Sequence, residues 1–427
     1  MHGGQRGRAV ISSLRGFRDI LPPESDRFAR IEAAAREVFG LYGYRELRIP
    51  TLELKELFVK STGDTTDIVE KEMYAFTDGG GREIANRPEG TPGVVRAYIE
   101  HNLGQTGRNA KFFYIGSMFR AERPQAGRFR EFEQIGTEHI GNPTPAADAE
   151  NISMLVRLLE KTGAEGCSVE LNSLGCSECR KAYRGVLLAF LRERTEKLCD
   201  PCRGRLERNP LRALDCKTDA PWLKTEAPKL PLCPACLEHF DGVQRLLGAA
   251  GITYNVNPGL VRGLDYYTRT VFEVRSAALG SQDAVAGGGR YDDLVRSMGG
   301  PAAPAVGWAM GVDRLVMLLG DKLAPDKAPK AFVIALAKEA GDKAFELLTR
   351  MRDAQISADF SDFTLSLKSQ LRSADKSGAS FALLIGEDEL KAGTVAVKPL
   401  RGNGEQFTIP AADAPSKIKE QLKGRVD

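Results

Sequence analysis

The stretch from Lys111 to Gly141 constrains the fold of this chain more than any other part of the sequence. Its first part alternates polar and apolar residues as a strand does, a turn-rich basic stretch follows, and a second strand-like run ends it. This order predicts an antiparallel β-hairpin, in which side chains two residues apart share a face. The residues predicted to line one face are Arg120 and Glu122 on the first strand and Gln134, Gly136 and Glu138 on the second. We expect Gly136 to leave open space, so that this face could hold a phosphate beside an ammonium group.

The loop of this hairpin is basic and aromatic. Arg123, Arg128 and Arg130 can neutralise phosphates through paired hydrogen bonds. Phe129 and Phe132 could stack on a base. A solvated basic loop without a ligand is the alternative, and the loop composition alone does not separate the two.

The overall composition is that of a globular protein. A length of 427 residues predicts about two to four domains, and 42% hydrophobic with 27% charged residues is ordinary for such domains. The net charge of +3 does not by itself indicate a nucleic-acid partner. No run approaches the roughly 18 apolar residues of a membrane span, and residues 1–16, although basic, lack the apolar core of a signal peptide. We therefore expect no membrane association and a cytoplasmic location.

Two elements precede the hairpin. The apolar spacing from Ser25 to Tyr42 predicts a helix, and a strand-like run with Pro50 inside it follows from Tyr44. Because proline cannot donate to a central ladder, this strand should lie at an edge or an interface. A dimer interface and ordinary core packing both fit. Further on, residues 87–91 (RPEGT) predict a strand end turning into a helix, which puts Glu89 at a corner where binding groups often lie.

All eight cysteines lie between Cys167 and Cys236. Most of this part of the chain differs in composition from its surroundings, which predicts an insertion into a larger domain. Residues 176–240 are locally basic, with 13 Lys/Arg against 7 Asp/Glu between Arg180 and Lys229. Three C-x-x-C pairs in this segment are typical of structural zinc sites. The ligand set that we predict is Cys199, Cys202, Cys233 and Cys236, with Cys176, Cys179 and Cys216 as alternative ligands. Reduced, partly buried thiols remain the alternative to a metal.

After the insertion, strand-like runs resume, and three segments near them carry polar residues or glycines that could form a site. Arg262, Tyr266 and Tyr267 cluster at a turn and could close a pocket around a planar polar ring. Residues 287–291 (GGGRY) allow a ligand to approach the backbone closely, although the spacing is that of neither a Walker nor a Rossmann loop. Arg314, on a helix after a glycine-bearing strand, is either a surface cation or a phosphate clamp.

The last hundred residues form a separate pattern. Residues 321–330 predict a linker, with two prolines and several lysines. From about Ala331 strands and helices alternate, which predicts a small α/β domain with a largely parallel sheet.

Several of these stretches together resemble the histidyl-tRNA synthetase family of class II aminoacyl-tRNA synthetases. The motifs are RPEGT at Arg87, FRAERPQAGRFREFEQIGTE at Phe119, LVRGLDYYTRTVFE at Leu260, GGGRYD at Gly287 and GWAMGVDRL at Gly307. The likeness implies an α+β catalytic core, with an antiparallel six-stranded sheet flanked by helices, made of residues 1–175 and 241–325. It also implies a mostly helical insertion at 176–240 and an α/β anticodon-binding domain at 328–427. The helix from Ser25 and the Pro50 strand resemble the motif that forms the dimer interface in this class.

The resemblance implies a histidine–tRNA ligase, with ATP and Mg²⁺, L-histidine and tRNA(His) as reaction partners, and a homodimer. Arg120 and Arg262 would be catalytic, on opposite sides of the α-phosphate. The implied histidine-binding residues are Glu89, Gly90, Thr91, Arg120, Gln134, Glu138, Arg262, Tyr266, Tyr267 and Tyr291. The implied ATP-binding residues are Arg120, Glu122, Arg128, Phe132 and Arg314. Arg123 and Gln125 would contact tRNA.

The chain departs from the family pattern in two places. Asp313 and Trp308 stand where many relatives carry Glu and Phe, and many relatives lack the cysteine pairs, so zinc does not follow from the resemblance. A non-catalytic, histidine-binding regulatory subunit of the ATP phosphoribosyltransferase type is the main alternative. Such a protein lacks the anticodon-binding domain, whereas this chain has a C-terminal α/β pattern and retains Arg120, Arg262 and Arg314.

Overall fold

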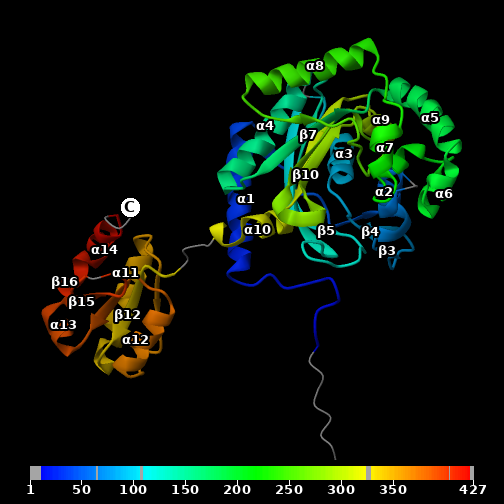
Figure 1. Cartoon of the computed structure of the whole chain (residues 1–427). Coiled ribbons are helices and arrows are strands. Elements are labelled where there is room, and N and C mark those ends of the chain that lie inside the picture. Colours follow the sequence, from blue (N-terminus) through cyan, green and yellow to red (C-terminus); the bar gives the residue numbers. More distant parts are fainter. Residues whose placement is uncertain (1–10, 64–65, 106–108, 324–327, 403, 424–427) are drawn as a thin grey trace, which may run out of the picture. The chain divides into compact units, whose positions relative to one another are not determined.

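The computed structural model describes residues 11–63, 66–105, 109–323, 328–402 and 404–423 (Figure 1). The basic lead-in at residues 1–10 and the middle of the predicted linker, residues 324–327, lie outside the described residues. The chain forms two compact units, Met1–Ala324 and Pro325–Asp427. No helix in the described ranges is long and apolar enough to cross a membrane.

The first unit is built on an eight-stranded sheet. Its strands are, in spatial order, β1 (Arg45–Glu46), β5 (Ala110–Phe119), β6 (Glu131–Ile140), β11 (Ala305–Gly311), β10 (Ala284–Arg290), β9 (Thr268–Ser276), β7 (Cys167–Ser173) and β8 (Asn255–Val256). The six long strands from β5 to β7 all pair antiparallel, as predicted. The two-residue strands β1 and β8 add a parallel pairing at each edge.

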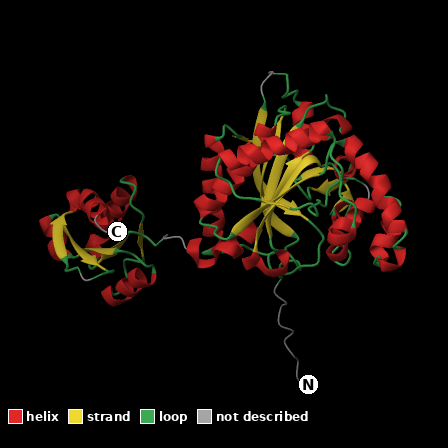
Figure 2. Ribbon diagram, turned by 45° about the horizontal axis from the view of Figure 1, so that its top comes forward, coloured by secondary structure: helices red, strands yellow, loops and turns green. Residues whose placement is uncertain are grey.

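Helices cover both faces of this sheet (Figure 2). On one face lie α1 (Glu24–Leu41), α4 (Pro145–Thr162), α8 (Pro234–Ala249) and α10 (Val312–Leu319). They bury the main core, which includes Phe39, Phe272 and Trp308. The predicted helix 25–42 is confirmed, because its buried residues recur at helical spacing. On the other face lie α3 (Thr91–Glu100) and α9 (Leu294–Ser297), around a second core of Val95, Tyr98 and Leu294.

The strand predicted from Tyr44 is split by its proline. β1 belongs to the edge of the large sheet, whereas β2 (Leu52–Leu54) belongs to a separate three-stranded sheet with β4 (Glu83–Asn86) and β3 (Ala75–Thr77). Pro50 lies in the crossover between the two sheets, since it has no N–H to donate. Helix α2 (Lys55–Thr62) and a π-helix at Ile68–Glu72, which the sequence pattern did not indicate, complete this region.

The inserted segment is helical. It consists of α5 (Ser177–Arg192), α6 (Asp200–Arg205) and α7 (Ala220–Glu226), with 3₁₀ turns at Thr195–Lys197 and Pro210–Asp215. Its own small core includes Tyr183, Leu187 and Leu223.

The second unit is a five-stranded sheet with helices. Its strand order is β13 (Ala358–Phe360), β12 (Ala331–Ala335), β14 (Phe381–Ile385), β15 (Thr394–Pro399) and β16 (Phe407–Pro410). The helices are α11 (Gly341–Asp353), α12 (Leu367–Lys376), α13 (Glu387–Ala392) and α14 (Ala414–Lys423). The prediction of a largely parallel sheet is wrong, because β14–β15 and β15–β16 pair antiparallel. Residues 386–393 are too few for a crossover between parallel strands.

Candidate active site

A cavity of about 740 Å³ opens on the face of the large sheet opposite α1 and α4. Its walls come from β6, β9, β10, β11, the hairpin loop between β5 and β6, the start of α10, the segment before β9 and the insertion. The predicted site residues that line it are Glu89, Thr91, Arg120, Glu122, Arg128, Phe132, Gln134, Arg262, Tyr266, Tyr267, Tyr291 and Arg314. Residues up to 225 positions apart in the chain, from Glu89 to Arg314, therefore meet at one site.

Small residues make the floor of the cavity. The strand register places Gly136, Ala309, Gly287 and Glu273 in one row across β6, β11, β10 and β9. A Cβ atom at Gly287 would lie 2.5 Å from the guanidinium of Arg262. Gly287 therefore leaves the space in which Arg262 lies over the sheet, where its Nη1 pairs with the Glu273 carboxylate.

Two buried carboxylates lie at one end of the site: Glu89 lines the cavity, whereas Glu138 does not line it but contacts Thr91 and Tyr291, which do. Glu138 is 1% exposed and accepts a hydrogen bond of 2.6 Å from the hydroxyl of Thr91 and another from the hydroxyl of Tyr291. Burial raises the pKa of Glu138 to about 8, although these two donors lower it. Glu89 accepts hydrogen bonds from Thr62 (3.2 Å) and Tyr266 (2.9 Å), and burial raises its pKa as well.

Tyr114 fills the space that was predicted to be open over Gly136. The two residues are directly opposite on β5 and β6, and a Cβ at Gly136 would lie 2.3 Å from the Tyr114 ring. A Cβ at Gly90 would meet the same ring at 2.2 Å. The glycines thus admit an aromatic side chain, whose hydroxyl donates a 3.0 Å hydrogen bond to Gln134. The prediction of open space at Gly136 is wrong, because it considered one strand and not its neighbour.

Arginines gather at the other end of the cavity. Arg120 donates from Nε to the carbonyl of Pro88 (2.9 Å), and its guanidinium lies 5.3 Å from the centre of the Phe132 ring. Glu122 joins two of these arginines, at 2.8 Å from Arg128 and 3.9 Å from Arg120. Burial lowers the pKa of Arg314, and the charges of Arg128 and Arg120 lower it further. Three mutually repelling cations around one carboxylate are suited to a multiply charged anion.

The two predicted tRNA contacts lie outside the cavity. The hairpin loop closes through reciprocal backbone hydrogen bonds between Gln125 and Arg128 (3.1 and 2.9 Å), with Gly127 at a positive φ of 67°. This turn exposes the side chains of Arg123 and Gln125 while Arg128 lines the cavity.

Sequence reasoning missed Tyr114, Glu273 and Thr62. Tyr114 of β5 precedes Arg120, the residue directly after that strand, by six residues, so a strict two-residue period would have placed the two on the same face. The two-residue period of β9 could have placed Glu273 on the face of the site. Thr62 lies on α2, and nothing in the sequence around it indicates a contact with Glu89.

Two further motif residues make contacts that hold elements of the fold together, and of the two only Asp313 also lines the cavity. Arg290 of the GGGRY segment is fully buried in an ion pair with Asp148, which is also 0% exposed, and points away from the cavity wall. Asp313 accepts a hydrogen bond from Arg18 (2.9 Å) and another from the backbone N–H of Glu133 (3.0 Å). The Asp at this position thereby joins the N-terminal segment, α10 and β6.

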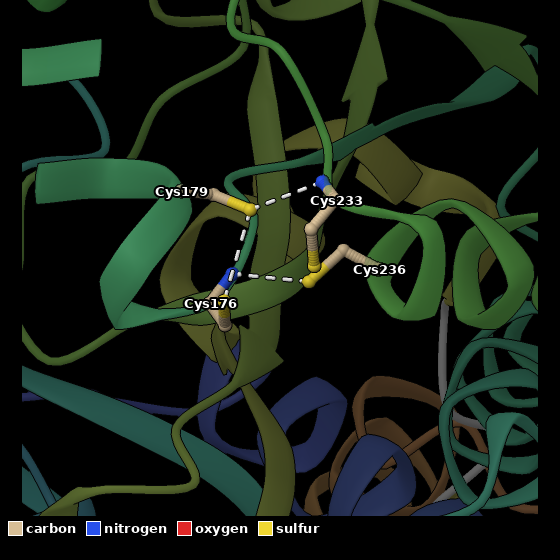
Figure 3. Close-up of side chains that lie close together, drawn as sticks. All are labelled: Cys176, Cys179, Cys233 and Cys236. Atoms are coloured by element: carbon tan, nitrogen blue, oxygen red, sulfur yellow. Dashed lines mark hydrogen bonds between the residues drawn. The ribbon is translucent and has the colours of Figure 1, made fainter. Parts of the chain in front are cut away.

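The cysteines group differently from the predicted set. Cys176, Cys179, Cys233 and Cys236 form one cluster (Figure 3), and Cys199, Cys202, Cys216 and Asp219 form another. The pairing of Cys199/Cys202 with Cys233/Cys236 is therefore wrong. C-x-x-C spacing brings two sulfurs together in one turn, but the tertiary structure selects the partner pair.

Comparison with known proteins agrees with this geometry. Residues 16–315 match the family model described as histidyl-tRNA synthetase, and residues 330–421 match the model of an anticodon-binding domain. The chain belongs to the histidyl-tRNA synthetase family. A histidine–tRNA ligase of Elusimicrobium minutum is 55% identical over 95% of this chain and 98% of its own length. That of Geobacter sulfurreducens is 48% identical over 94% of this chain and 97% of its own length.

Solved structures show the same architecture. The apo histidyl-tRNA synthetase of Staphylococcus aureus superposes with a TM-score of 0.81 at 32% identity, over 96% of this chain and 100% of that one. An ATP phosphoribosyltransferase regulatory subunit/histidyl-tRNA synthetase from Bacillus halodurans, at 22% identity and a TM-score of 0.64, covers 87% of this chain and 97% of its own and shares the fold. The relatives at 55% and 48% identity are named histidine–tRNA ligases, which favours the catalytic interpretation over the regulatory one.

Proposed function

We propose that this chain activates L-histidine with ATP and transfers it to tRNA(His). One observation carries the proposal: the buried Glu89 and a cluster of arginines line the same cavity, and the buried Glu138 accepts hydrogen bonds from Thr91 and Tyr291 in its wall. Arg262 lies in the same cavity, over Gly287. The carboxylate end suits an ammonium group and an imidazole, and the arginine end suits a triphosphate.

In the first step the carboxylate of histidine attacks the α-phosphate of ATP, and pyrophosphate leaves. Glu89, Glu138 and Gln134 would hold the amino acid, with Gly90 and Thr91 beside them and with Tyr266, Tyr267 and Tyr291 closing the pocket. The hydroxyl donors already on Glu138 and Glu89 fix each carboxylate before substrate arrives, so little reorganisation is needed. Buried polar groups of this kind reject side chains without matching donors.

Arg120 and Arg262 would stabilise the charge that develops on the α-phosphate. Arg128 and Arg314 would bind the outer phosphates, Phe132 would stack on the adenine, and Glu122 would orient the arginines. The carboxylates that line the cavity, among them Glu72, Glu122 and Glu273, fit Mg²⁺, which prefers oxygen ligands and would neutralise part of the triphosphate charge. No residue has to form a covalent intermediate, because positioning and charge stabilisation suffice.

In the second step the histidyl group passes to the 3′ end of the tRNA. The exposed Arg123 and Gln125 lie at the tip of the hairpin loop, where a macromolecule can reach them. We assign the acceptor arm to the insertion 176–240, whose basic side chains include the exposed Lys181, Arg184 and Arg208. Residues 328–427 would bind the anticodon, whose bases can be splayed and read individually.

We also propose a homodimer in the cytoplasm. Leu54 and Phe76 lie in one row of the three-stranded sheet, flanking Ile84, and both are exposed. Leu52 on the same edge and Leu41 at the end of α1 are exposed as well. The apolar side chains of the three-stranded sheet, one of whose strands continues the predicted interface strand, would pack against the same side chains of a second copy. Sedimentation measures the oligomeric state of the parent protein and of the variant Leu54→Glu/Phe76→Glu. A dimeric parent protein and a monomeric variant would support the assignment, whereas a monomeric parent protein would contradict it.

The function is tested by ATP–pyrophosphate exchange with each amino acid in turn, without tRNA. We expect exchange that depends on histidine alone, followed by charging of tRNA(His). Folded protein that binds histidine but exchanges with no amino acid would indicate the regulatory alternative instead. Finally, we propose that the insertion carries structural Zn²⁺, because thiolate-rich sites select this ion.

A further inference from the structure

Seven of the eight cysteines take part in two separate four-ligand clusters. The base centre consists of Cys176, Cys179, Cys233 and Cys236, and the tip centre consists of Cys199, Cys202, Cys216 and Asp219. In each centre the four ligand atoms lie within 4.8 Å of one another. Cys167 belongs to neither and provides an internal control.

The sulfur separations are those of metal ligands. Cys176 Sγ lies 3.7 Å from Cys179 Sγ, and Cys199 Sγ lies 3.6 Å from Cys216 Sγ. A tetrahedral zinc site with Zn–S bonds of about 2.3 Å has sulfur–sulfur edges of about 3.8 Å. A disulfide would require about 2.0 Å. In each centre this separation matches one edge of such a tetrahedron, and the other ligand atoms lie within 4.8 Å.

The backbone around the base centre favours thiolates. The N–H of Cys176 donates to Cys236 Sγ and the N–H of Cys233 donates to Cys179 Sγ, both at 3.2 Å (Figure 3). Each C-x-x-C pair thus donates to a sulfur of the other pair, which is the kind of outer-shell hydrogen bonding that orients metal ligands. Cys176 and Cys233 also precede the first turns of α5 and α8, where the helix dipole favours negative charge.

The tip centre contains a buried carboxylate, which suits a cation. Asp219 is 1% exposed, and its two carboxylate oxygens each accept from the N–H of Cys199 at 3.2 Å. In the part of the chain that the structure describes, no lysine or arginine forms an ion pair with Asp219. A carboxylate buried among three sulfurs is costly unless a cation compensates it. A metal ion bound to the same four groups supplies that charge.

We propose that the chain binds two Zn²⁺ ions, one in each centre, and that the ions have different tasks. The base centre joins the two ends of the insertion, since Cys176 follows β7 and Cys233 begins the helix that returns to the core. A helical segment of this size with a small core of its own commonly needs such a staple. The tip centre holds residues 216–219, and Cys199, Cys216, Lys217 and Thr218 line the catalytic cavity. Its effect on catalysis, unlike zinc binding itself, rests on the proposed function.

The test begins with the zinc content of the purified full-length protein. We expect two Zn²⁺ per chain, one in Cys233→Ser/Cys236→Ser, one in Cys199→Ser/Cys216→Ser, and two in the control Cys167→Ser. A chain without zinc, or zinc that both double variants retain in full, would overturn the proposal. If a double variant does not fold, titration of the folded parent protein with a mercurial replaces it. Release of two Zn²⁺ ions per chain by the mercurial supports the proposal, and release of one or none overturns it.

Cobalt substitution tests the assignment of Asp219. The sulfur-to-cobalt charge-transfer absorption grows with the number of thiolates, so four at the base centre and three at the tip centre give different intensities per ion. Asp219→Cys should keep two metal ions and raise the intensity of the tip centre to that of the base centre. An unchanged spectrum in Asp219→Cys would show that residue 219 is not a ligand.

Hydrogen exchange separates the two tasks. Loss of the base centre should speed amide exchange across the whole insertion 176–240, whereas loss of the tip centre should speed it only around residues 195–220. The same pattern in both variants would refute the division of tasks. These readouts are independent of histidine activation, so failure of the metal proposal and failure of the proposed function are distinguishable.

Discussion

Replacing Arg262 should separate catalysis from folding more cleanly than any other change in this site. Arg262 lies over Gly287 and pairs with Glu273, which also accepts a 2.6 Å hydrogen bond from Arg275. In Arg262→Ala the Glu273 carboxylate keeps Arg275 as its partner, so it is not left as an isolated charge. Because the Arg262 side chain is 22% exposed to the cavity, water can replace it. We expect the free energy of unfolding to change by at most about 1 kcal/mol.

The kinetic effect should be much larger. If Arg262 stabilises charge on the α-phosphate in the transition state, its removal should slow histidine-dependent pyrophosphate exchange by about 10²–10³-fold. This loss corresponds to roughly 3–4 kcal/mol of transition-state stabilisation. The matched control is Arg275→Ala, which removes the other arginine from the same carboxylate and leaves Arg262 in place. It should exchange within about threefold of the parent protein.

Gly287→Ala tests the position of the guanidinium without removing its charge. The added Cβ would lie 2.5 Å from the Arg262 guanidinium, so the end of this flexible side chain must move. We expect about a tenfold loss of exchange in Gly287→Ala and almost no further loss when it is added to Arg262→Ala, because the two residues act as a unit. Exchange near the parental rate in Arg262→Ala, or additive losses in the double variant, would refute this account of the site.

Three further predictions follow from other parts of the first unit. Arg290→Ala should lower the free energy of unfolding, measured in urea, by about 3–5 kcal/mol, because Asp148 would remain buried without its partner; a loss below about 1 kcal/mol would contradict this. Burial raises the pKa of Glu138 to about 8 in the folded state, so its stabilising contribution is complete below about pH 4.5 and is lost as the pH rises through 8. Glu138→Gln should therefore gain stability relative to the parent protein between pH 5.5 and 8, and parallel pH profiles would rule out the raised pKa. Arg123→Ala should slow tRNA charging at least tenfold while exchange stays within about twofold, and equal losses in both steps would remove the tRNA assignment.

The periodicity of the sequence was sufficient to predict a feature wherever that feature depends on a single strand, helix or hairpin. The antiparallel pairing of the hairpin, the helix at Glu24–Leu41 and the corner at Glu89 follow from local spacing, because helices and strands place side chains at fixed intervals. The chemical composition of the site, two carboxylates with several arginines, was also evident from these stretches. The separation of a C-terminal unit followed from the change of pattern near residue 330.

What the sequence alone determined was thus the set of elements and the groups they carry, since both are properties of short segments. Only the tertiary structure decided which groups meet. Tyr114 occupies the space over Gly136 because it stands opposite on the neighbouring strand, and Arg290 is structural because Asp148 of a distant helix faces it. The cysteines group differently from the prediction for the same reason. Spacing brings two sulfurs together within a turn, but the path of the chain through sixty residues decides which other side chains complete each cluster.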